Sequence, residues 1–267
     1  MRILLAEDEK VISLMLVNKG GVSMSKYQGT FKRYEKKYLI NEIKYKMIRQ
    51  ALEDKLKIDN YGKVTICNVY FDTPNYQLIR KSLEKPVYKE KLRLRSYGTP
   101  QVGDKVFIEL KKKYKGVVYK RREEMELLVA EQHLYEKKPL AKPTQITNEI
   151  DWFISFYKEV VPTMYISYNR IAMYGIENPE LRVTFDSNIL WRTEELKLDK
   201  GSWGNTILEE GYRVMEIKIP GAMPVWLSHI LDELDIYPTS FSKYGAGYLI
   251  LKEQKNIQSK KGEIRYA

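Results

Sequence analysis

The segment EKLRLRSYG, residues 90 to 98, places Lys91, Arg93 and Arg95 in alternation with Leu92 and Leu94. Alternate side chains of a β-strand share a face, so a strand here would carry three cations on one face and two leucines on the other. The cationic face could lie in water, as on an ordinary half-buried strand. It could also face an anion inside the fold. Phosphate would suit this face, because the planar guanidinium of Arg can donate two parallel hydrogen bonds to phosphate oxygens and the ammonium of Lys supplies a compact positive charge.

The same alternation recurs in five further segments, each with apolar residues on the opposite face. Each segment also places a carboxylate on its charged face. Mg²⁺ and Mn²⁺ prefer oxygen ligands, so such a carboxylate predicts a place for a divalent metal. The charged positions are Arg33, Glu35 and Lys37; Glu109, Lys111 and Lys113; Lys120, Arg122 and Glu124; Arg182, Thr184 and Asp186; and Glu216 and Lys218.

Two arrangements of these strands remain open. The first is an amphipathic sheet whose charged face is solvated. The second is an antiparallel β-barrel whose charged face lines the lumen and whose apolar face meets helices packed outside. Burying many cations without partners is costly, so the second arrangement requires a polyanion and a metal inside. We favour the barrel because the cations cluster in strand after strand.

The rest of the chain supplies the elements that would position this face. Alternating and β-branched segments predict strands at 31–40, 63–73, 87–97, 104–113, 117–128, 164–174, 181–187 and 212–219. Apolar residues at helical spacing predict helices at 41–57, 74–85, 131–137, 147–160 and 224–236, with caps at Asn41 and Thr147. The mixture predicts one α+β domain over residues 24–251, followed by a polar C-terminal tail over 252–267.

Composition narrows the class of protein. Lys and Arg total 46 against 35 Asp and Glu, a net charge of +11, which indicates an anionic partner. The single cysteine, Cys67, excludes an intramolecular disulfide framework and fits a reducing compartment. No apolar run approaches the ~20 residues needed to span a bilayer. We therefore expect a cytoplasmic protein without a membrane segment of its own.

The amino terminus does not fit this domain. MRILLAEDEK resembles the first strand and acidic pair of a response-regulator receiver domain, whose remainder is missing. The residues NKGGVSM that follow could be encoded by a ribosome-binding site placed just before a start codon. We expect residues 1–23 to be an extension and translation to start at Met24.

Eight motifs in order resemble the VTC domain, within the CYTH-like or triphosphate tunnel metalloenzyme superfamily. They are RYEKKYLI, YFDT, KLRLRSYG, FIELKKK, YNRIAMYG, LRVTFD, MEIKIPG and SFSKYGAGY, and they run from about Phe31 to Leu251. The resemblance implies an antiparallel β-tunnel that binds a triphosphate. One departure concerns the superfamily's first motif, Glu-x-Glu-x-Lys, which here is Arg33, Glu35 and Lys37. The missing first glutamate fits the VTC branch better than the thiamine triphosphatase or adenylate cyclase branches.

The resemblance also implies roles for individual residues, and the strand pattern adds Lys91, Arg122, Glu35 and Glu109 to them. Residues predicted to act on the transferring phosphate are Arg93, Arg95, Lys111, Arg170, Arg182 and Lys218. Residues predicted to bind the phosphate chain are Lys37, Lys91, Lys120, Arg122, Tyr168, Ser242 and Lys243. Glu216, Glu35 and Glu109 are the predicted metal ligands.

The activity implied is a polyphosphate polymerase that transfers the γ-phosphate of ATP to a growing chain, with Mn²⁺ or Mg²⁺ as cofactor. A triphosphate hydrolase on the same fold is one alternative. A non-catalytic module that binds polyphosphate or inositol phosphates is another. Nucleic-acid binding is disfavoured because no RRM, KH or helix-turn-helix pattern is present. Any membrane channel that receives the polymer would be a separate protein.

Overall fold

The computed structural model describes residues 33–115 and 117–264 of the chain. The expected extension at 1–23 and the start at Met24 lie outside the described residues. Everything below concerns the unit that begins at Lys32.

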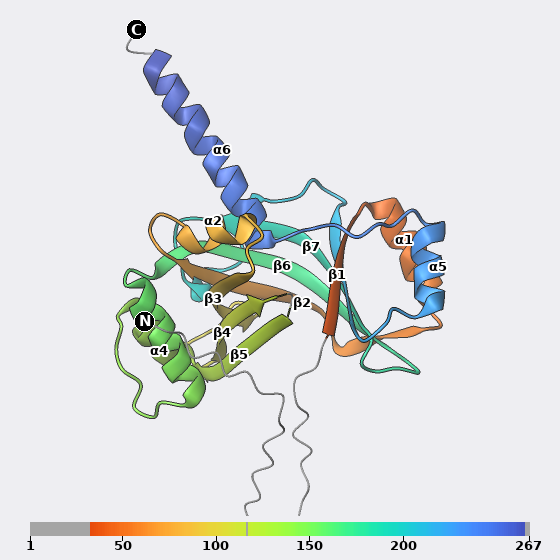
Figure 1. The fold of residues 1–267 in the computed structure, drawn as a ribbon, viewed down its shortest axis with the longest axis horizontal. Helices are drawn as coiled ribbons and strands as arrows, with labels where there is room; N and C mark the ends of the chain where they lie inside the picture. The colour runs from red at the N-terminus through yellow and green to blue at the C-terminus, as the bar shows by residue number, and fades with distance from the viewer. Residues whose placement is uncertain (1–32, 116, 265–267) are drawn as a thin grey trace, which may run out of the picture. The chain divides into compact units, whose positions relative to one another are not determined.

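A nine-stranded antiparallel sheet dominates this unit (Figure 1). The strands run in the order β1-β9-β7-β6-β2-β3-β4-β5, and the short β8 pairs with β7 beside this path. Every strand pair within the described residues is antiparallel, which confirms the predicted α+β class with an antiparallel sheet. The strands are Arg33–Ile40 (β1), Leu56–Asp72 (β2), Tyr88–Tyr97 (β3), Lys105–Tyr114 (β4), Val117–Glu126 (β5), Val161–Gly175 (β6), Arg182–Arg192 (β7), Asn205–Thr206 (β8) and Arg213–Pro220 (β9).

The sheet is curled but is not closed into a hydrogen-bonded barrel. In the described part of the chain, β1 and β5 are the two edges and do not pair with each other. The curl nevertheless brings distant strands face to face, because Lys111 Nζ on β4 lies 3.5 Å from Glu35 Oε2 on β1. The expectation of a closed barrel is therefore corrected to an open, tunnel-like sheet.

Four helices cover the apolar face of the sheet in two groups (Figure 1). Helices α1 (Glu42–Ala51) and α5 (Val225–Glu233) pack over β1, β7 and β9. Helices α3 (Leu127–Tyr135) and α4 (Gln145–Tyr157) pack over β2, β3 and β4. Asn41 caps α1 as predicted, whereas α4 is capped by Thr144, with Thr147 as the third residue of a capping box.

A third apolar core lies on the opposite face, under α2 (Gln77–Leu83) and the start of α6 (Lys243–Ile264). The rings of Tyr70 and Tyr244 stack there, with centroids 4.6 Å apart. Gly247 allows α6 to approach β6 closely, because a Cβ at this position would lie 2.7 Å from Met164 Sδ. Helix α6 then runs on beyond Leu251, so residues 252–264 of the expected polar tail are helical (Figure 1).

Two other boundaries differ from the sequence prediction. Helix α1 ends at Ala51, and strand β2 begins as early as Leu56. Cross-strand pairing of Leu56 with Gly175 and of Ile58 with Met173 holds this segment extended, where local spacing alone favours a helix. Within the described residues, no helix is long and apolar enough to cross a membrane.

Candidate functional site

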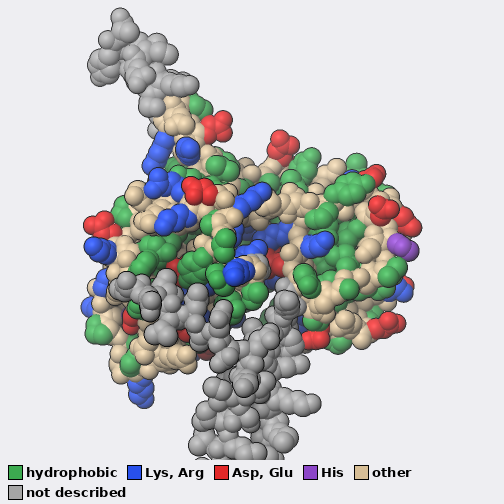
Figure 2. All heavy atoms as spheres, viewed as in Figure 1, with side chains coloured by type: hydrophobic (Ala, Val, Ile, Leu, Met, Phe, Trp, Pro, Cys, Tyr) green, Lys and Arg blue, Asp and Glu red, His purple; other side chains and the backbone are tan. Residues whose placement is uncertain are grey.

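The strand register combines the separate charged faces into one surface, which we call the lumen face. Arg93 lies opposite Glu109, and Lys91 opposite Lys111. On the other side of the sheet, the alternating Leu92 is fully buried in the core beneath α3 and α4. Figure 2 shows Lys and Arg side chains gathered around acidic atoms in a hollow at the middle of the molecule. The alternation in the sequence therefore separates a helix-covered core from a cationic lumen.

Glu109 on β4 anchors one group of cations. Its side chain is 1% exposed, and it accepts hydrogen bonds from Arg93 Nε and Arg122 Nε, both at 2.8 Å. Lys120 Nζ lies 2.8 Å from the same carboxylate, and Arg95 Nη1 lies 3.7 Å away. Burial alone would raise the pKa of the Glu109 carboxyl, but the surrounding cations hold this pKa well below its usual value. Both carboxylate oxygens are engaged, so the geometry favours an anchoring role for Glu109 over the predicted metal-binding role.

Asp186 on β7 anchors a second group. It is fully buried and accepts two hydrogen bonds from the Arg170 guanidinium, at 2.6 and 2.7 Å. Lys243 Nζ, at the start of α6, lies 2.5 Å from the same carboxylate. Burial would raise the pKa of Asp186, but Lys243 and Arg170 lower it overall. The sequence pattern predicted Asp186 on the charged face but not among the site residues. Its role depends on its position opposite Arg170 in the β6–β7 register, which the sequence pattern did not predict.

Neutral side chains of β2 orient two of the arginines. Arg95 Nε donates to Asn68 Oδ1 at 2.9 Å, and Arg93 Nη1 donates to the Tyr70 hydroxyl at 3.2 Å. Sequence reasoning missed both Asn68 and Tyr70, because β2 carries no cationic alternation. Each lies directly opposite the arginine that it contacts. Fixed guanidinium planes suit bidentate phosphate binding.

Tyr168 on β6 lies among three cations. Its hydroxyl accepts a hydrogen bond from Arg95 Nη2 at 3.1 Å, and Lys243 Nζ lies 4.4 Å from its ring centroid. Burial would raise the pKa of Tyr168, but Arg95, Arg170 and Lys243 lower this pKa to about 8. The phenol is thus polarised by the same cations that were predicted to bind phosphate.

The β1–β9 pair places two carboxylates and two lysines in a checkerboard. Glu35 lies opposite Lys218, and Lys37 lies opposite Glu216. Lys218 Nζ lies 2.6 Å from Glu216, and Lys37 Nζ lies 3.4 Å from Glu35. Burial would raise the pKa of Glu216, but Lys218 and Lys37 hold it well below its usual value. Burial would raise the pKa of Glu35 too, and the charge of Glu216 adds to this, but Lys111, Lys37 and Lys218 lower it overall. Lys37 pairs with Glu35 and lies opposite Glu216 in the register, so the two carboxylates flank one lysine.

This carboxylate pair fits a divalent metal that is shared with phosphate. The described residues contain no group of three or more His, Cys, Asp or Glu able to hold a metal alone. Mg²⁺ and related ions are commonly held by one or two carboxylates, with substrate phosphates completing the coordination. Glu35 and Glu216 would supply those two carboxylates to a bound ion, and the lysines beside them favour phosphate.

The start of α6 closes one side of the lumen. Ser242 Oγ accepts hydrogen bonds from Lys91 Nζ at 2.9 Å and from the Gly245 backbone N–H at 3.2 Å. Lys37 Nζ donates to the Phe241 carbonyl at 3.2 Å. Lys243 is the first residue of α6, so the cationic lining continues from the sheet onto the start of this helix. Arg182 is exposed at the rim, with its guanidinium 5.6 Å from the Tyr174 ring centroid.

Cations outnumber carboxylates on the lumen face, and this excess contributes to lowering the pKa values of some of its lysines. Burial, followed by the charges of Lys37, Lys89 and Lys111, lowers the pKa of Lys91 to about 7. Burial also lowers the pKa of Lys120 to about 8, although Glu109 opposes the shift. A bound polyanion would reverse these shifts, because it favours the charged form of each lysine.

We expect anion binding to be coupled to proton uptake. Near pH 8 the free Lys91 amine is mostly neutral, whereas a phosphate chain raises its pKa, so binding takes up about one proton at this lysine. Tripolyphosphate affinity should then fall by up to about tenfold per pH unit as the pH rises above 7. Calorimetry in buffers of different ionisation enthalpy measures the uptake. A Lys91→Met variant, which corrects for protonation of the ligand itself, should take up fewer protons; equal uptake by the two proteins contradicts the assignment.

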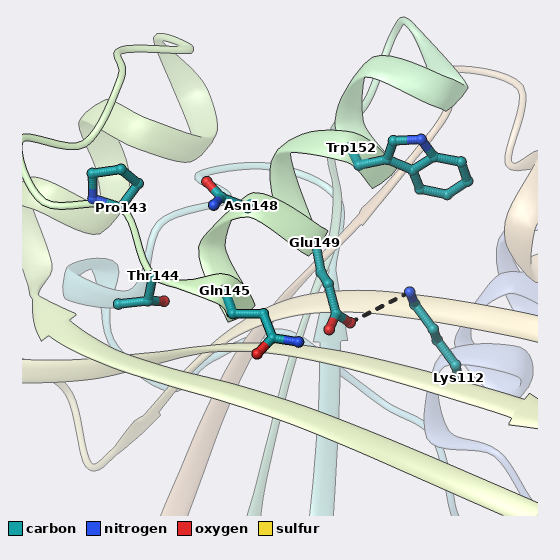
Figure 3. A pocket seen from close by; sticks show the side chains of 7 residues that line it. All are labelled: Lys112, Pro143, Thr144, Gln145, Asn148, Glu149 and Trp152. Carbon is teal, nitrogen blue, oxygen red and sulfur yellow. Dashed lines mark ion pairs between the residues drawn. The ribbon is translucent and has the colours of Figure 1, made fainter. Parts of the chain in front are cut away.

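A separate hollow of about 560 Å³ lies on the outer side of the sheet, beside α4 (Figure 3). Its lining includes Lys112, whose Nζ lies 3.6 Å from Glu149, together with the exposed Trp152. Lys112 alternates with Lys111 and Lys113, so it points away from the lumen. The hollow therefore does not belong to the cationic site.

Comparisons with known proteins give one family match and several similar solved structures. The family model of the VTC domain matches residues 32–252. A solved structure of a putative adenylate cyclase from Bacillus halodurans is similar with a TM-score of 0.50 and 16% identity, covering 78% of this chain and 92% of that one. A protein of Pyrococcus horikoshii follows with a TM-score of 0.42 and 13% identity, over 83% and 99% of the two chains. No curated protein matches the sequence.

Proposed function

Because this chain belongs to the VTC domain family, we propose that it is a metal-dependent polyphosphate polymerase. It would transfer the γ-phosphate of ATP to the end of a polyphosphate chain held on the lumen face. The observation that carries the proposal is the excess of cations on this face, where Arg93, Arg95 and Arg170 are fixed by buried carboxylates. Such an arrangement suits a chain of phosphates better than a single small anion.

Phosphoryl transfer requires positioning and charge neutralisation more than covalent chemistry from the protein. Arg93, Arg95 and Arg170 would bind oxygens of the transferring phosphate, with Arg182 at the rim. Lys111 and Lys218 would neutralise neighbouring charges. The phosphate chain would be held by Lys37, Lys91, Lys120, Arg122, Tyr168, Ser242 and Lys243.

Glu216 and Glu35 would hold Mg²⁺ or Mn²⁺ beside the triphosphate. When bound, the metal neutralises phosphate charge and polarises the transferring group. Lys218 and Lys37 keep both carboxylates ionised and therefore ready to bind a cation.

The acid–base properties of the lumen carboxylates favour polymerase over hydrolase. Lys91, Lys120 and Tyr168 have pKa values of about 7 to 8 in the free protein, but a bound polyanion raises them and so keeps these groups protonated. A hydrolase gains from a base that activates water, and a good base has a pKa near the working pH. The pKa values of Glu109, Asp186 and Glu216 are all lowered, so these carboxylates are weak bases. The terminal phosphate of a polyphosphate chain is already an oxyanion and needs no such base.

We propose a cytoplasmic location and a separate membrane partner. A polymerase that consumes ATP would work in the cytoplasm, in agreement with the single, buried Cys67. A membrane protein that receives the polymer would then be a separate chain. Nucleic acid is not proposed as a ligand, because the arginines that buried carboxylates hold in place lie on the curled inner face of the sheet.

Product analysis tests the proposal. The purified protein is incubated with ATP and Mg²⁺ or Mn²⁺, quenched with chelator, and examined on a gel that resolves polyphosphate chains, while orthophosphate is measured in parallel. A ladder of chains formed at the expense of ATP is the expected result. Orthophosphate without chains would assign the fold to a triphosphate hydrolase. Tight polyphosphate binding with neither product would assign it to a non-catalytic binding module.

A further inference from the structure

The lumen face changes its chemistry from one end to the other. Along β3 it presents Lys89, Lys91, Arg93, Arg95 and Tyr97 in turn. The antiparallel β4 follows the same gradient, because its lumen residues lie opposite those of β3 in order. The pairs are Lys89 with Lys113, Lys91 with Lys111, Arg93 with Glu109, and Arg95 with Phe107. One end of this path is therefore aromatic, and the other end carries only lysines.

The aromatic end is built around Tyr97. Its side chain is 51% exposed, and its ring meets the Phe107 ring edge-on, with centroids 5.7 Å apart. Arg122 Nη2 donates to the Tyr97 hydroxyl at 2.8 Å, and the Arg122 guanidinium lies 4.1 Å from the Phe107 ring centroid. Arg122 is itself held by Glu109, which also anchors Arg93 and Arg95. A fixed ring with open surface thus stands directly beside the arginines.

At the opposite end of the described strands β3 and β4, the lumen positions are lysines and carry no aromatic ring. Lys85, Lys89 and Lys113 gather there, and in the described part of the chain none of them forms an ion pair with a carboxylate. Lys89 Nζ donates to the Ser82 carbonyl at 3.3 Å. The stacked rings of Tyr70 and Tyr244 deeper in the lumen are both buried, so their faces are not free. The lysine end is therefore suited to anions that carry no nucleobase, such as a chain of phosphates.

We propose that the lumen is directional: the nucleobase of the nucleoside triphosphate stacks on Tyr97 beside Phe107, and the phosphate chain leaves over Lys89 and Lys113. This inference rests on the proposed function. The path along β3 from Tyr97 to Lys89 spans eight residues, or roughly 27 Å. This length exceeds what a triphosphate needs and leaves the lysine end for a longer chain. Stacking tolerates any base, so the site selects a nucleoside triphosphate over inorganic phosphate without reading the base by hydrogen bonds.

Metal-free affinities for ATP and for inorganic tripolyphosphate test the aromatic end. Stacking of one base contributes enough that Tyr97→Ala should raise the ratio of the ATP to the tripolyphosphate dissociation constant roughly five- to tenfold. Tyr97→Phe should keep the wild-type ratio. Tyr119→Ala serves as the control, because Tyr119 is a partly exposed tyrosine on the outer face of β5. Melting temperatures verify that the variants are folded.

The lysine end is tested with long-chain polyphosphate. The double variant Lys89→Ala, Lys113→Ala should weaken binding of the long chain about tenfold more than binding of ATP. An unchanged ATP-to-tripolyphosphate ratio in Tyr97→Ala overturns the nucleobase site, even when both ligands bind tightly. Equal losses of affinity for ATP and for long polyphosphate in the double lysine variant overturn the proposal that the phosphate chain leaves over Lys89 and Lys113. Failure of the wild-type protein to bind either tripolyphosphate or ATP would instead refute the proposed function itself.

Discussion

Glu216→Gln is expected to lower the rate of chain growth roughly a thousandfold, since a bound metal supplies several kcal/mol of charge stabilisation to phosphoryl transfer. Glutamine keeps the size of the side chain but loses the charge that would attract the metal. The same change should strengthen metal-free binding of tripolyphosphate severalfold, because Lys218 loses the carboxylate that lies 2.6 Å from its amine. Activity and affinity thus move in opposite directions.

The opposite signs separate a metal ligand from a merely structural residue. Rates are measured on the polyphosphate gel, and metal-free affinity is measured by calorimetry. Glu233→Gln, on the exposed surface of α5, is the matched control and should change neither. Parallel losses of activity and of metal-free affinity in Glu216→Gln would show that Glu216 supports the fold instead of holding the metal.

Glu109→Gln is expected to lower the free energy of unfolding by about 3 kcal/mol. The carboxylate is buried, and its removal leaves Arg93, Arg95, Lys120 and Arg122 without their common partner. The loss lies at the lower end of the range for broken buried ion pairs, because Lys120 and Arg122 reach solvent. Denaturant unfolding at low salt measures it.

Tripolyphosphate should reverse much of this loss. A polyanion in the lumen replaces the missing carboxylate, so the rise in melting temperature on adding tripolyphosphate should be larger for Glu109→Gln than for the wild type. Glu149→Gln is the control, because Glu149 pairs with Lys112 and Arg121 on the outer side of the sheet. This exposed pairing should contribute less than about 1 kcal/mol and should not respond to the ligand. Equal ligand effects in both variants would contradict an anionic ligand beside Glu109.

The cationic face could be predicted from the sequence because a strict two-residue period is visible in one strand at a time. Lys91, Arg93 and Arg95 alternate with leucines that the fold buries completely. The resemblance to the VTC domain then assigned these strands to one known fold. The match of the VTC family model to residues 32–252 confirms this resemblance. Periodicity and motif order were sufficient for this part of the account.

Contacts between strands could not be predicted in the same way. The pairing of Arg170 with Asp186 depends on the register of β6 and β7, which a bulge shifts between Ser167 and Asn169. The role of Asn68 depends on its place opposite Arg95. Neither the open edge between β1 and β5 nor the continuation of α6 past Leu251 leaves a periodic signal, because both follow from long-range packing.

The most direct test of the account compares two neighbouring lysines of β4 in the product assay. Lys111 points into the lumen, and its sequence neighbour Lys112 points outward. Lys111→Ala and Lys112→Ala therefore each remove one positive charge from adjacent positions of β4, but from opposite faces of the sheet. The wild type and Lys112→Ala should both extend polyphosphate chains from ATP, whereas Lys111→Ala should lose at least about tenfold of this activity. Equal rates of chain growth in the two variants would contradict a reaction on the lumen face.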